Sequence, residues 1–231
     1  MSKILFVVTG SDHWTLADGS EHPTGYWAEE VIAPYRAFKS AGYEIVVATP
    51  GGVVPTLDQA SLAPEFNGGE QGAADMRSAL DDAEELTRPI PLEDVAVGDY
   101  AAVFYPGGHG PMEDLSVDKN SARVLLETLA SGRPLAVVCH APAALLATVD
   151  DDGRSPFDGY RLTAFTDAEE RTTGLADNAK WLLQDRLVRL DIDFREETAW
   201  SPHVEVDRGL FTGQNPASAG PLADEVLAAL A

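Results

Sequence analysis

The sequence predicts an α/β protein with a mostly parallel central β-sheet covered by helices on both faces. Apolar runs of strand length alternate with amphipathic, helix-length stretches along the 231 residues, which is the pattern of βαβ units. The runs are also apolar without interruption, as expected of parallel strands buried on both faces. A chain of this length can bury the core of one three-layer unit. We therefore expect a single domain over residues 1–231.

Five runs are the expected strands of this sheet. They span residues 4–9, 45–50, 101–105, 135–139 and, as a candidate, 162–165. Near the C-terminus, the Asp207-Arg208-Gly209 turn separates two further runs, 204–206 and 210–212. That arrangement predicts a β-hairpin.

The expected helices lie between and after these strands. The first has Thr24 as a possible N-cap and ends at Gly42, and Pro34 within it should kink it or open its first turns. The others span residues 118–131, 140–148, 178–190 and 222–230. Segment 51–98 fits the alternation least well, because prolines and a Gly-Gly pair interrupt it around one acidic helix at 75–86. We interpret it as a loop-rich insertion near the carboxyl ends of the strands, where open α/β sheets place their ligand sites.

Charge and composition exclude several classes of protein. The formal net charge of −22 repels nucleic acid phosphates and anionic membranes, so neither is an expected partner. The one cysteine rules out an intramolecular disulfide and a cysteine-rich zinc module. The apolar run at residues 4–8 is too short for a signal peptide, and no run approaches the roughly 18 residues of a membrane span. The expected location is the cytoplasm.

Cys139 is the strongest candidate for a chemical role. A buried strand ends at this residue and a helix of small residues follows at once, so its side chain should be exposed above the sheet edge in a sharp turn. The helix N-terminus should lower the pKa of the thiol, and His140 could serve as base or as a stabilising cation. The alternative is a small core residue. The glycine-rich loop 105–110, whose backbone N–H groups can form an oxyanion hole, favours the functional interpretation.

The chain resembles the ThiJ/PfpI superfamily of the class I glutamine amidotransferase-like fold, and within it the branch of heat-shock chaperone/glyoxalase III proteins. The matching motifs occur in the expected order over nearly the whole chain. They are Gly25-Tyr-Trp-Ala-Glu-Glu30 with Pro34, Gly42-Tyr43, Thr49-Pro-Gly-Gly52, Gly107-Gly-His-Gly110 with Asp114-Leu115, Val138-Cys-His-Ala-Pro142, Thr163-Ala-Phe-Thr-Asp167 with Glu169-Glu170, and Leu210-Phe-Thr-Gly-Gln-Asn-Pro-Ala-Ser218.

The resemblance implies a flavodoxin-like α/β/α sandwich and a set of site residues. Cys139 is then the nucleophile with His140 beside it, and Glu30 is the acid that hydrogen-bonds the sulfur. Glu170 is our choice for the carboxylate that orients His140, with Glu169 as the competing choice. The substrate-binding candidates are Gly108 and His109, and the backbone N–H groups of Gly108 and His140 are the expected oxyanion donors. A homodimer is expected because relatives commonly form one.

Two positions depart from the family pattern. Ala141 stands where many members have glycine, which should narrow the pocket floor. Gln184 replaces an expected glutamate, so the usual contacts of that segment are in doubt. Some relatives bind a metal through two histidines and a carboxylate. His13 and His22, nine positions apart in a loop, form no recognisable metal motif. We expect pocket-lining or surface roles for them, and we predict no metal and no cofactor.

The leading functional hypothesis is a glyoxalase III-type (D-lactate dehydratase type) lyase that converts methylglyoxal and similar 2-oxoaldehydes without glutathione. Cys139 would add to the aldehyde, and Glu30 or His140 would move a proton between the two carbons. A stress-response holdase or cysteine redox sensor is the alternative from another class. A third hypothesis is a hydrolase, an amidase or peptidase, in which His140 must protonate an amine leaving group.

Overall fold

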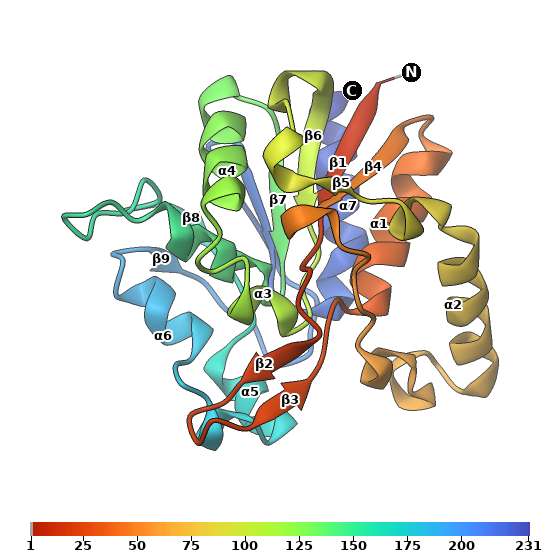
Figure 1. Ribbon diagram of the computed structural model, residues 1–231, viewed down its shortest axis with the longest axis horizontal. Helices are drawn as coiled ribbons and strands as arrows, with labels where there is room; N and C mark the ends of the chain where they lie inside the picture. Colours follow the sequence, from red (N-terminus) through yellow and green to blue (C-terminus); the bar gives the residue numbers. More distant parts are fainter. Residues whose placement is uncertain (1) are drawn as a thin grey trace.

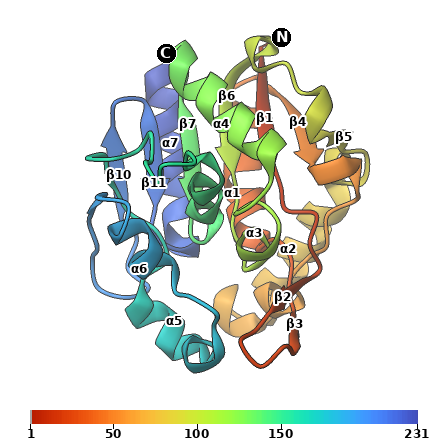
Figure 2. The same cartoon turned by 60° about the vertical axis from the view of Figure 1, so that its left-hand side comes forward.

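The computed structural model describes residues 2–231 and has a seven-stranded sheet at its centre (Figures 1 and 2). The strand order is β10-β11-β7-β6-β1-β4-β5, and every neighbouring pair is parallel except β10 with β11. The strands are β1 (Lys3–Val7), β4 (Glu44–Thr49), β5 (Ile90–Pro91), β6 (Tyr100–Tyr105), β7 (Leu135–Val138), β10 (Val204–Asp207) and β11 (Leu210–Gly213). The predicted α/β fold class is confirmed.

Helices cover both faces of this sheet and create two apolar cores. Along β1 the side chains alternate, so that Ile4 and Phe6 belong to one core and Leu5 and Val7 to the other. The first core contains α1 (Ala28–Ser40), α2 (Glu70–Asp82) and α7 (Ala219–Leu230). The second contains α4 (Lys119–Ser131), α6 (Leu183–Val188) and the 3₁₀-helix 141–148. Burial on both faces explains the uninterrupted apolar runs of the sequence.

Several predicted elements are confirmed with small shifts in their bounds. The first four strands correspond to β1, β4, β6 and β7, and the predicted hairpin is β10–β11. The predicted helix 118–131 is α4, with Asp118 accepting a hydrogen bond from Ser121 N as N-cap and Gly132 closing it in the left-handed conformation.

Other predictions are wrong in detail. Thr24 is not the cap of α1, since the helix begins after Trp27 and Thr24 Oγ1 donates to Asp58 instead. The helix runs on through Pro34 to Ser40. The candidate strand 162–165 is reduced to β8 (Arg161–Leu162), which pairs outside the central sheet with β9 (Asp193–Phe194). Only α6 and a 3₁₀ turn remain of the predicted helix 178–190.

The loops at the carboxyl ends of the strands carry the remaining elements. They are the hairpin of β2 (His13–Thr15) and β3 (Glu21–Pro23), the short helix α3 (Gly110–Glu113) and helix α5 (Asp167–Thr173). Segment 51–98 begins with loops and a 3₁₀ turn at Pro64–Phe66, forms α2, and adds β5 to the sheet beside β4. Among residues 2–231, no helix combines the length and apolar character needed to cross a membrane.

Candidate active site

Cys139 lies at a sharp turn between β7 and the 3₁₀-helix 141–148. Its φ is 60°, in the left-handed region that is unfavourable for a residue with a side chain. Two backbone bonds hold it there: Cys139 N donates to Gly213 O (2.9 Å), and Phe165 N donates to Cys139 O (2.8 Å). The predicted elbow is therefore present, although the helix that follows it is of the 3₁₀ type throughout.

Glycine 107 lets the loop after β6 approach this elbow. A Cβ at residue 107 would lie 2.8 Å from Glu30 Oε2 and 2.9 Å from His140 N, which is closer than real Cβ contacts. Gly107 N instead donates to Glu30 Oε2 over 2.7 Å. The neighbouring Gly108 has its backbone N–H near the Cys139 sulfur, a contact that partly opposes the rise in the thiol pKa caused by burial. The glycines thus bring Glu30 and a backbone donor to the sulfur.

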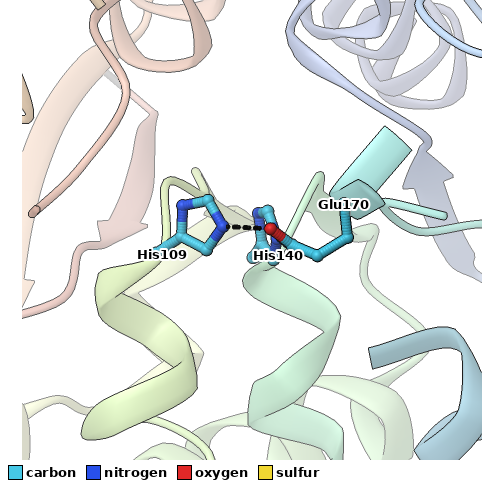
Figure 3. Close-up of side chains that lie close together, drawn as sticks. All are labelled: His109, His140 and Glu170. Carbon is cyan, nitrogen blue, oxygen red and sulfur yellow. Dashed lines mark hydrogen bonds and ion pairs between the residues drawn. The ribbon is translucent and has the colours of Figure 1, made fainter. Parts of the chain in front are cut away.

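A carboxylate joins two histidine rings next to the cysteine (Figure 3). Glu170 Oε2 lies 2.6 Å from His140 Nε2, and Glu170 Oε1 lies 2.8 Å from His109 Nε2. On the other side of its ring, His140 Nδ1 is 3.3 Å from Cys139 Sγ. Glu170, rather than Glu169, is thus the carboxylate that contacts His140. All four side chains are buried.

Charge and burial fix the protonation of this group. Burial and the neighbouring His109 lower the pKa of His140 to about 4, so its ring is neutral at pH 7. Although burial alone would raise it, the pKa of Glu170 lies well below its ordinary value because of the two histidines. With Glu170 ionised, Nε2 of the His140 ring carries the proton. Nδ1 is then unprotonated, and its lone pair faces the sulfur.

The thiol itself differs from the sequence expectation. Burial raises the pKa of Cys139, and the adjacent Glu30 raises it further. The predicted lowering by a helix N-terminus is therefore wrong in direction, since desolvation of a fully buried sulfur outweighs a short 3₁₀-helix. A base is needed to form the thiolate, and Nδ1 of His140 is in position to be that base.

Glu30 projects from the first turn of α1 and is completely buried. Burial raises the pKa of its carboxyl to about 8, against the lowering contacts with Cys139 and Gly107. Glu30 is therefore mostly protonated at pH 7 and can donate a proton beside the sulfur. Its Oε1 is buried without a hydrogen-bond partner.

Glu169 has a different set of partners from Glu170. Its Oε2 accepts from Thr166 N and Oγ1, and Glu169 N donates back to Thr166 Oγ1, which closes a capping box at the start of α5. Its Oε1 accepts from Trp200 N (2.8 Å), Gln214 Nε2 (3.1 Å) and Asn215 Nδ2 (2.8 Å). This carboxylate fixes α5, and with it Glu170, against the loop that holds Trp200.

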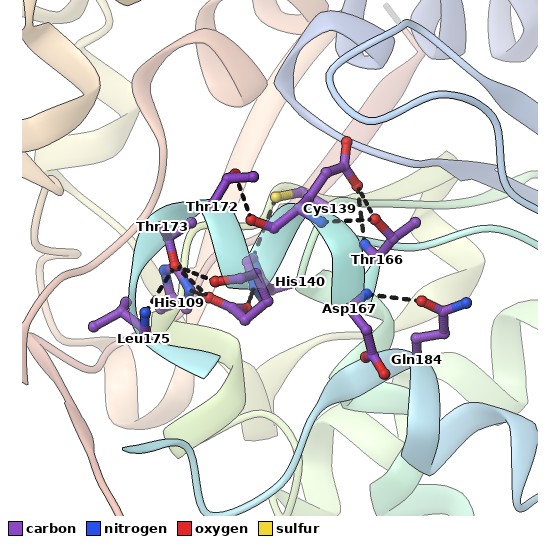
Figure 4. A network of polar contacts seen from close by, with 11 residues as sticks. His109, Cys139, His140, Thr166, Asp167, Thr172, Thr173, Leu175 and Gln184 are labelled. Atoms are coloured by element: carbon purple, nitrogen blue, oxygen red, sulfur yellow. Dashed lines mark hydrogen bonds and ion pairs between the residues drawn. The ribbon is translucent and has the colours of Figure 1, made fainter. Parts of the chain in front are cut away.

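Further polar contacts steady α5 (Figure 4). Thr173 Oγ1 donates to Glu170 Oε1 over 2.9 Å. At the other end of the helix, Asp167 N donates to Gln184 Oε1 over 2.7 Å, and Gln184 Nε2 donates to Glu196. Gln184, which replaces the glutamate expected from the family pattern, therefore still supplies an oxygen that accepts a hydrogen bond at the start of α5. Its side-chain NH₂ group adds a donor that a glutamate would lack.

A pocket of about 340 Å³ opens onto the sulfur. Cys139, His140, Gly108 and His109 line it, so both substrate-binding candidates are in the pocket wall. Glu30 and Glu170 lie behind these residues, where Glu170 contacts both histidines and Glu30 contacts the Cys139 side chain. Aromatic side chains supply much of the remaining wall: Trp27, Phe66, Phe165 and Trp200.

One group of side chains in the site could hold a metal ion. One ligand atom each of His109, His140 and Glu170 lies within 4.8 Å of the others. The hydrogen bonds between Glu170 and the two histidine rings are enough to explain why these three atoms lie close together. A metal ion could bind here only by displacing the Nε2 protons of both histidines. His13 lies outside this group and contacts Asp12 and Glu113 instead.

Sequence reasoning missed two parts of the site. The Glu169 network could have been suspected from Thr166 and Glu169, whose spacing is that of a capping box. Trp200 gave no such signal, because its segment has no regular periodicity. His22 was not missed: of the two roles expected for it, pocket-lining or surface, it has the first, and its ring packs edge-to-face with the ring of His109.

Comparison with known proteins finds relatives along almost the whole chain. The DJ-1/PfpI family matches residues 23–229 of the chain. The protein/nucleic acid deglycase HchA of Pseudomonas aeruginosa is 29% identical over 230 residues, which cover 95% of this chain and 77% of the relative. HchA of Staphylococcus aureus is 26% identical, with the same coverage.

Solved structures resemble the whole chain. Glyoxalase III from Candida albicans superposes with a TM-score of 0.84 at 26% identity, over 99% of this chain and 97% of that one. The Rapid Encystment Protein of 24 kDa from Francisella tularensis gives a TM-score of 0.87 at 26% identity and covers both chains completely. Proteins named as enzymes are thus among the relatives that match the full length of the fold.

Proposed function

Because the chain belongs to the DJ-1/PfpI family, we propose that it is a glyoxalase III-type enzyme that converts 2-oxoaldehydes to 2-hydroxy acids without glutathione or another cofactor. The observation that carries this proposal is the alignment of Glu170, His140 and Cys139 Sγ at a pocket, with a protonated carboxyl, Glu30, beside the sulfur. A relative of the same fold is named glyoxalase III.

The first step in this proposal is formation of the nucleophile. Neutral His140 takes the thiol proton of Cys139 through Nδ1, and ionised Glu170 stabilises the resulting imidazolium. The thiolate then forms a bond to the aldehyde carbon, and the imidazolium returns the proton to the oxygen to give a hemithioacetal. The backbone N–H of Gly108 stabilises the negative charge as it develops.

The second step moves hydrogen between two carbons. His140 removes the proton from the former aldehyde carbon, and Glu30 protonates the neighbouring carbon, while the hydroxyl proton passes between the two oxygens. The first carbon is oxidised to a thioester and the second is reduced to an alcohol, so no external electron acceptor is required. Water then attacks the thioester and gives one proton to Glu30. The imidazolium protonates the departing sulfur, and methylglyoxal has become lactate.

The experiment is formation of lactate from methylglyoxal by the purified protein in the absence of glutathione, beside Cys139→Ala and Glu30→Gln. We expect turnover by the wild type and by neither variant. Absence of lactate with all three proteins would contradict the proposal. In that case a Cys139 that is readily oxidised would favour a redox sensor, and suppression of client aggregation by all three proteins would favour a holdase.

We prefer the glyoxalase to an amidase because a relative of the same fold is named glyoxalase III. The same groups would serve an amidase, in which the imidazolium that forms when His140 takes the thiol proton protonates the departing amine. Turnover of chromogenic amides with no effect on methylglyoxal would reverse this choice. A homodimer, as the family resemblance implies, is part of the proposal, and analytical ultracentrifugation measures it directly.

Deglycation is the second candidate because HchA relatives are named for it. The net charge of −22 favours glycated lysine- or arginine-bearing proteins as substrates and disfavours nucleic acids. The test is release of N-acetylarginine from its preformed methylglyoxal adduct in the presence of excess aminoguanidine, which traps the free aldehyde. Release faster than with aminoguanidine alone supports direct deglycation, and equal rates restrict the enzyme to the free aldehyde.

A further inference from the structure

The pocket is larger than a three-carbon aldehyde requires. Its volume of about 340 Å³ lies within the range of about 300–1,000 Å³ that is typical of pockets enclosing drug-sized ligands. Cys139, which must reach the aldehyde, is 3% exposed, whereas Phe66 and Trp200 at other points of the pocket are 45% and 40% exposed. A substrate held at the sulfur therefore has room to extend toward solvent along apolar side chains.

Four aromatic residues, which we call the aromatic wall, line this room: Trp27, Phe66, Phe165 and Trp200. They form two edge-to-face pairs. Trp27 and Phe66 have ring centroids 5.2 Å apart, and Phe165 and Trp200 have centroids 5.5 Å apart. Phe165 also packs on the His140 ring at 4.3 Å, so this wall begins beside the proposed base. Such rings bind apolar and flat groups through burial and offset or edge contacts.

Trp200 is held in place at an energetic cost. Its φ of 67° is unfavourable for a residue with a side chain. Its backbone N–H is bound by Glu169, and its indole Nε1 donates to Thr172 Oγ1 over 3.2 Å. A strained backbone tied to a buried carboxylate indicates that the position of this exposed ring matters. A hydrophobic side chain left 40% exposed beside a pocket also gains stabilisation when a ligand covers it.

The charges at the pocket do not suit an anionic substrate. None of the residues that line it in the described chain is a lysine or arginine. The carboxylate among them, Asp58, already accepts hydrogen bonds from Thr24 Oγ1 and Ala60 N. A phosphate or a second carboxylate on the substrate would enter without a lysine or arginine to pair with, which is costly in an apolar pocket.

From these features we infer that the preferred substrates are uncharged 2-oxoaldehydes with an aromatic or similarly bulky apolar substituent, and that Phe66 and Trp200 determine this specificity. The inference rests on the proposed function, since it identifies the substrate class of the same site. The substituent lies against the aromatic wall while the aldehyde meets Cys139. Methylglyoxal reacts but leaves the outer pocket to water.

The test compares kcat/KM for phenylglyoxal, followed as mandelate, with kcat/KM for methylglyoxal, followed as lactate. Following the products avoids the side reaction of phenylglyoxal with arginine. We expect Phe66→Ala and Trp200→Ala each to lower the phenylglyoxal-to-methylglyoxal ratio by about tenfold, mostly through KM, because burial of one ring is lost. Dividing by the wild-type ratio cancels the different intrinsic reactivities of the two aldehydes.

Three controls make the test specific. Leu126→Ala removes an equally exposed side chain of α4 away from the pocket and should keep the wild-type ratio. Trp200→Phe keeps a ring and should restore most of it. In the wild type, 4-carboxyphenylglyoxal should be at least about tenfold poorer than phenylglyoxal, because its carboxylate meets no cation.

The outcomes separate this inference from the proposed function. Lactate formation with ratios unchanged by both alanine variants overturns the specificity inference and leaves the glyoxalase proposal intact. Equal use of 4-carboxyphenylglyoxal and phenylglyoxal overturns the charge argument. A protein that forms neither lactate nor mandelate overturns both proposals together.

Discussion

Two regions of the pocket differ in how their side chains are satisfied. The first is a polar cluster of five residues: Glu30, His109, Cys139, His140 and Glu170. All five are buried, and short hydrogen bonds join three of them. The second is the aromatic wall, whose outer members Phe66 and Trp200 are largely exposed to solvent. Apart from Glu30 Oε1, which has no hydrogen-bond partner, the cluster is stabilised by contacts within the protein, whereas the wall has apolar surface exposed to solvent that a ligand could cover.

This difference separates reactivity from selectivity. Desolvation and neighbouring groups shift the pKa values of Glu30, Cys139, His140 and Glu170, so a change in the cluster should alter the rate for every substrate. Changes in the wall should alter which substrate is preferred. Glu169 connects the two regions, because it anchors both α5 and the backbone of Trp200. The adjacent Glu169 and Glu170 therefore make a direct test of the comparison.

The largest expected effect is that of Glu170→Gln. A glutamine has one acceptor oxygen and cannot accept hydrogen bonds from both rings as the two carboxylate oxygens do, and it does not stabilise the imidazolium form of His140. We expect kcat for methylglyoxal and phenylglyoxal to fall by the same factor, about 10³-fold, with KM within about threefold. A fall for one aldehyde alone would contradict the assignment of Glu170 to the polar cluster.

Next in size is a pH effect on stability due to Glu30. Its pKa is about 8 in the folded protein against an ordinary value of 4.5, so the folded state keeps a proton that the unfolded chain releases. The free energy of unfolding should therefore fall as pH rises from 4.5 to 8, by about 5 kcal/mol in total if this group acts alone.

Glu30→Gln isolates that contribution, because glutamine has no proton to lose. Denaturant unfolding of wild type and variant at pH 5 and pH 8.5 gives the difference directly. We expect the variant to gain stability relative to the wild type at the higher pH. Parallel behaviour of the two proteins would mean that Glu30 titrates normally.

Glu169→Gln should act on stability rather than on chemistry. The buried carboxylate of Glu169 accepts five hydrogen bonds. In the glutamine variant, the NH₂ group of the side-chain amide would face some of these N–H and O–H donors and could not accept from them. We expect a loss of about 3 kcal/mol in the free energy of unfolding. Below the unfolding transition, the aldehyde preference should change more than kcat for methylglyoxal. The reverse pattern would place Glu169 in the polar cluster.

Features of the fold and the site could be predicted from the sequence where they depend on residues close together in the chain. The apolar runs and Gly132 act locally, and they predicted β1, β4, β6, β7 and α4. The Val-Val-Cys-His run also predicted the elbow at Cys139. The prediction of Thr24 as a helix cap was wrong because its hydroxyl donates a hydrogen bond to Asp58, 34 residues away. No local sequence pattern reveals such a partner.

The polar cluster was only partly predictable for the same reason. Its residues were recognised from motifs, but the contact of His109 with Glu170 joins loops 61 residues apart. The direction of the Cys139 pKa depends on burial, which the sequence could not measure. The two outer members of the aromatic wall were missed: Phe66 lies in the loop-rich segment and Trp200 has a backbone conformation that sequence patterns disfavour.

The smallest expected effect lies at Gln184, outside both regions. Gln184→Glu would retain the acceptor for Asp167 N but would lose the donor to Glu196 and place two carboxylates side by side. We expect a loss of about 0.5 kcal/mol in the free energy of unfolding, because like charges near the surface repel weakly. The double variant with Glu196→Gln should recover the lost stability, as should 1 M salt, which shortens the screening length to about 3 Å.

Since α5 carries Glu170, a change in kcat that salt does not reverse would show that Gln184 also helps to position the polar cluster. With kcat unchanged and stability restored by salt, the contact concerns charge balance at the helix start alone.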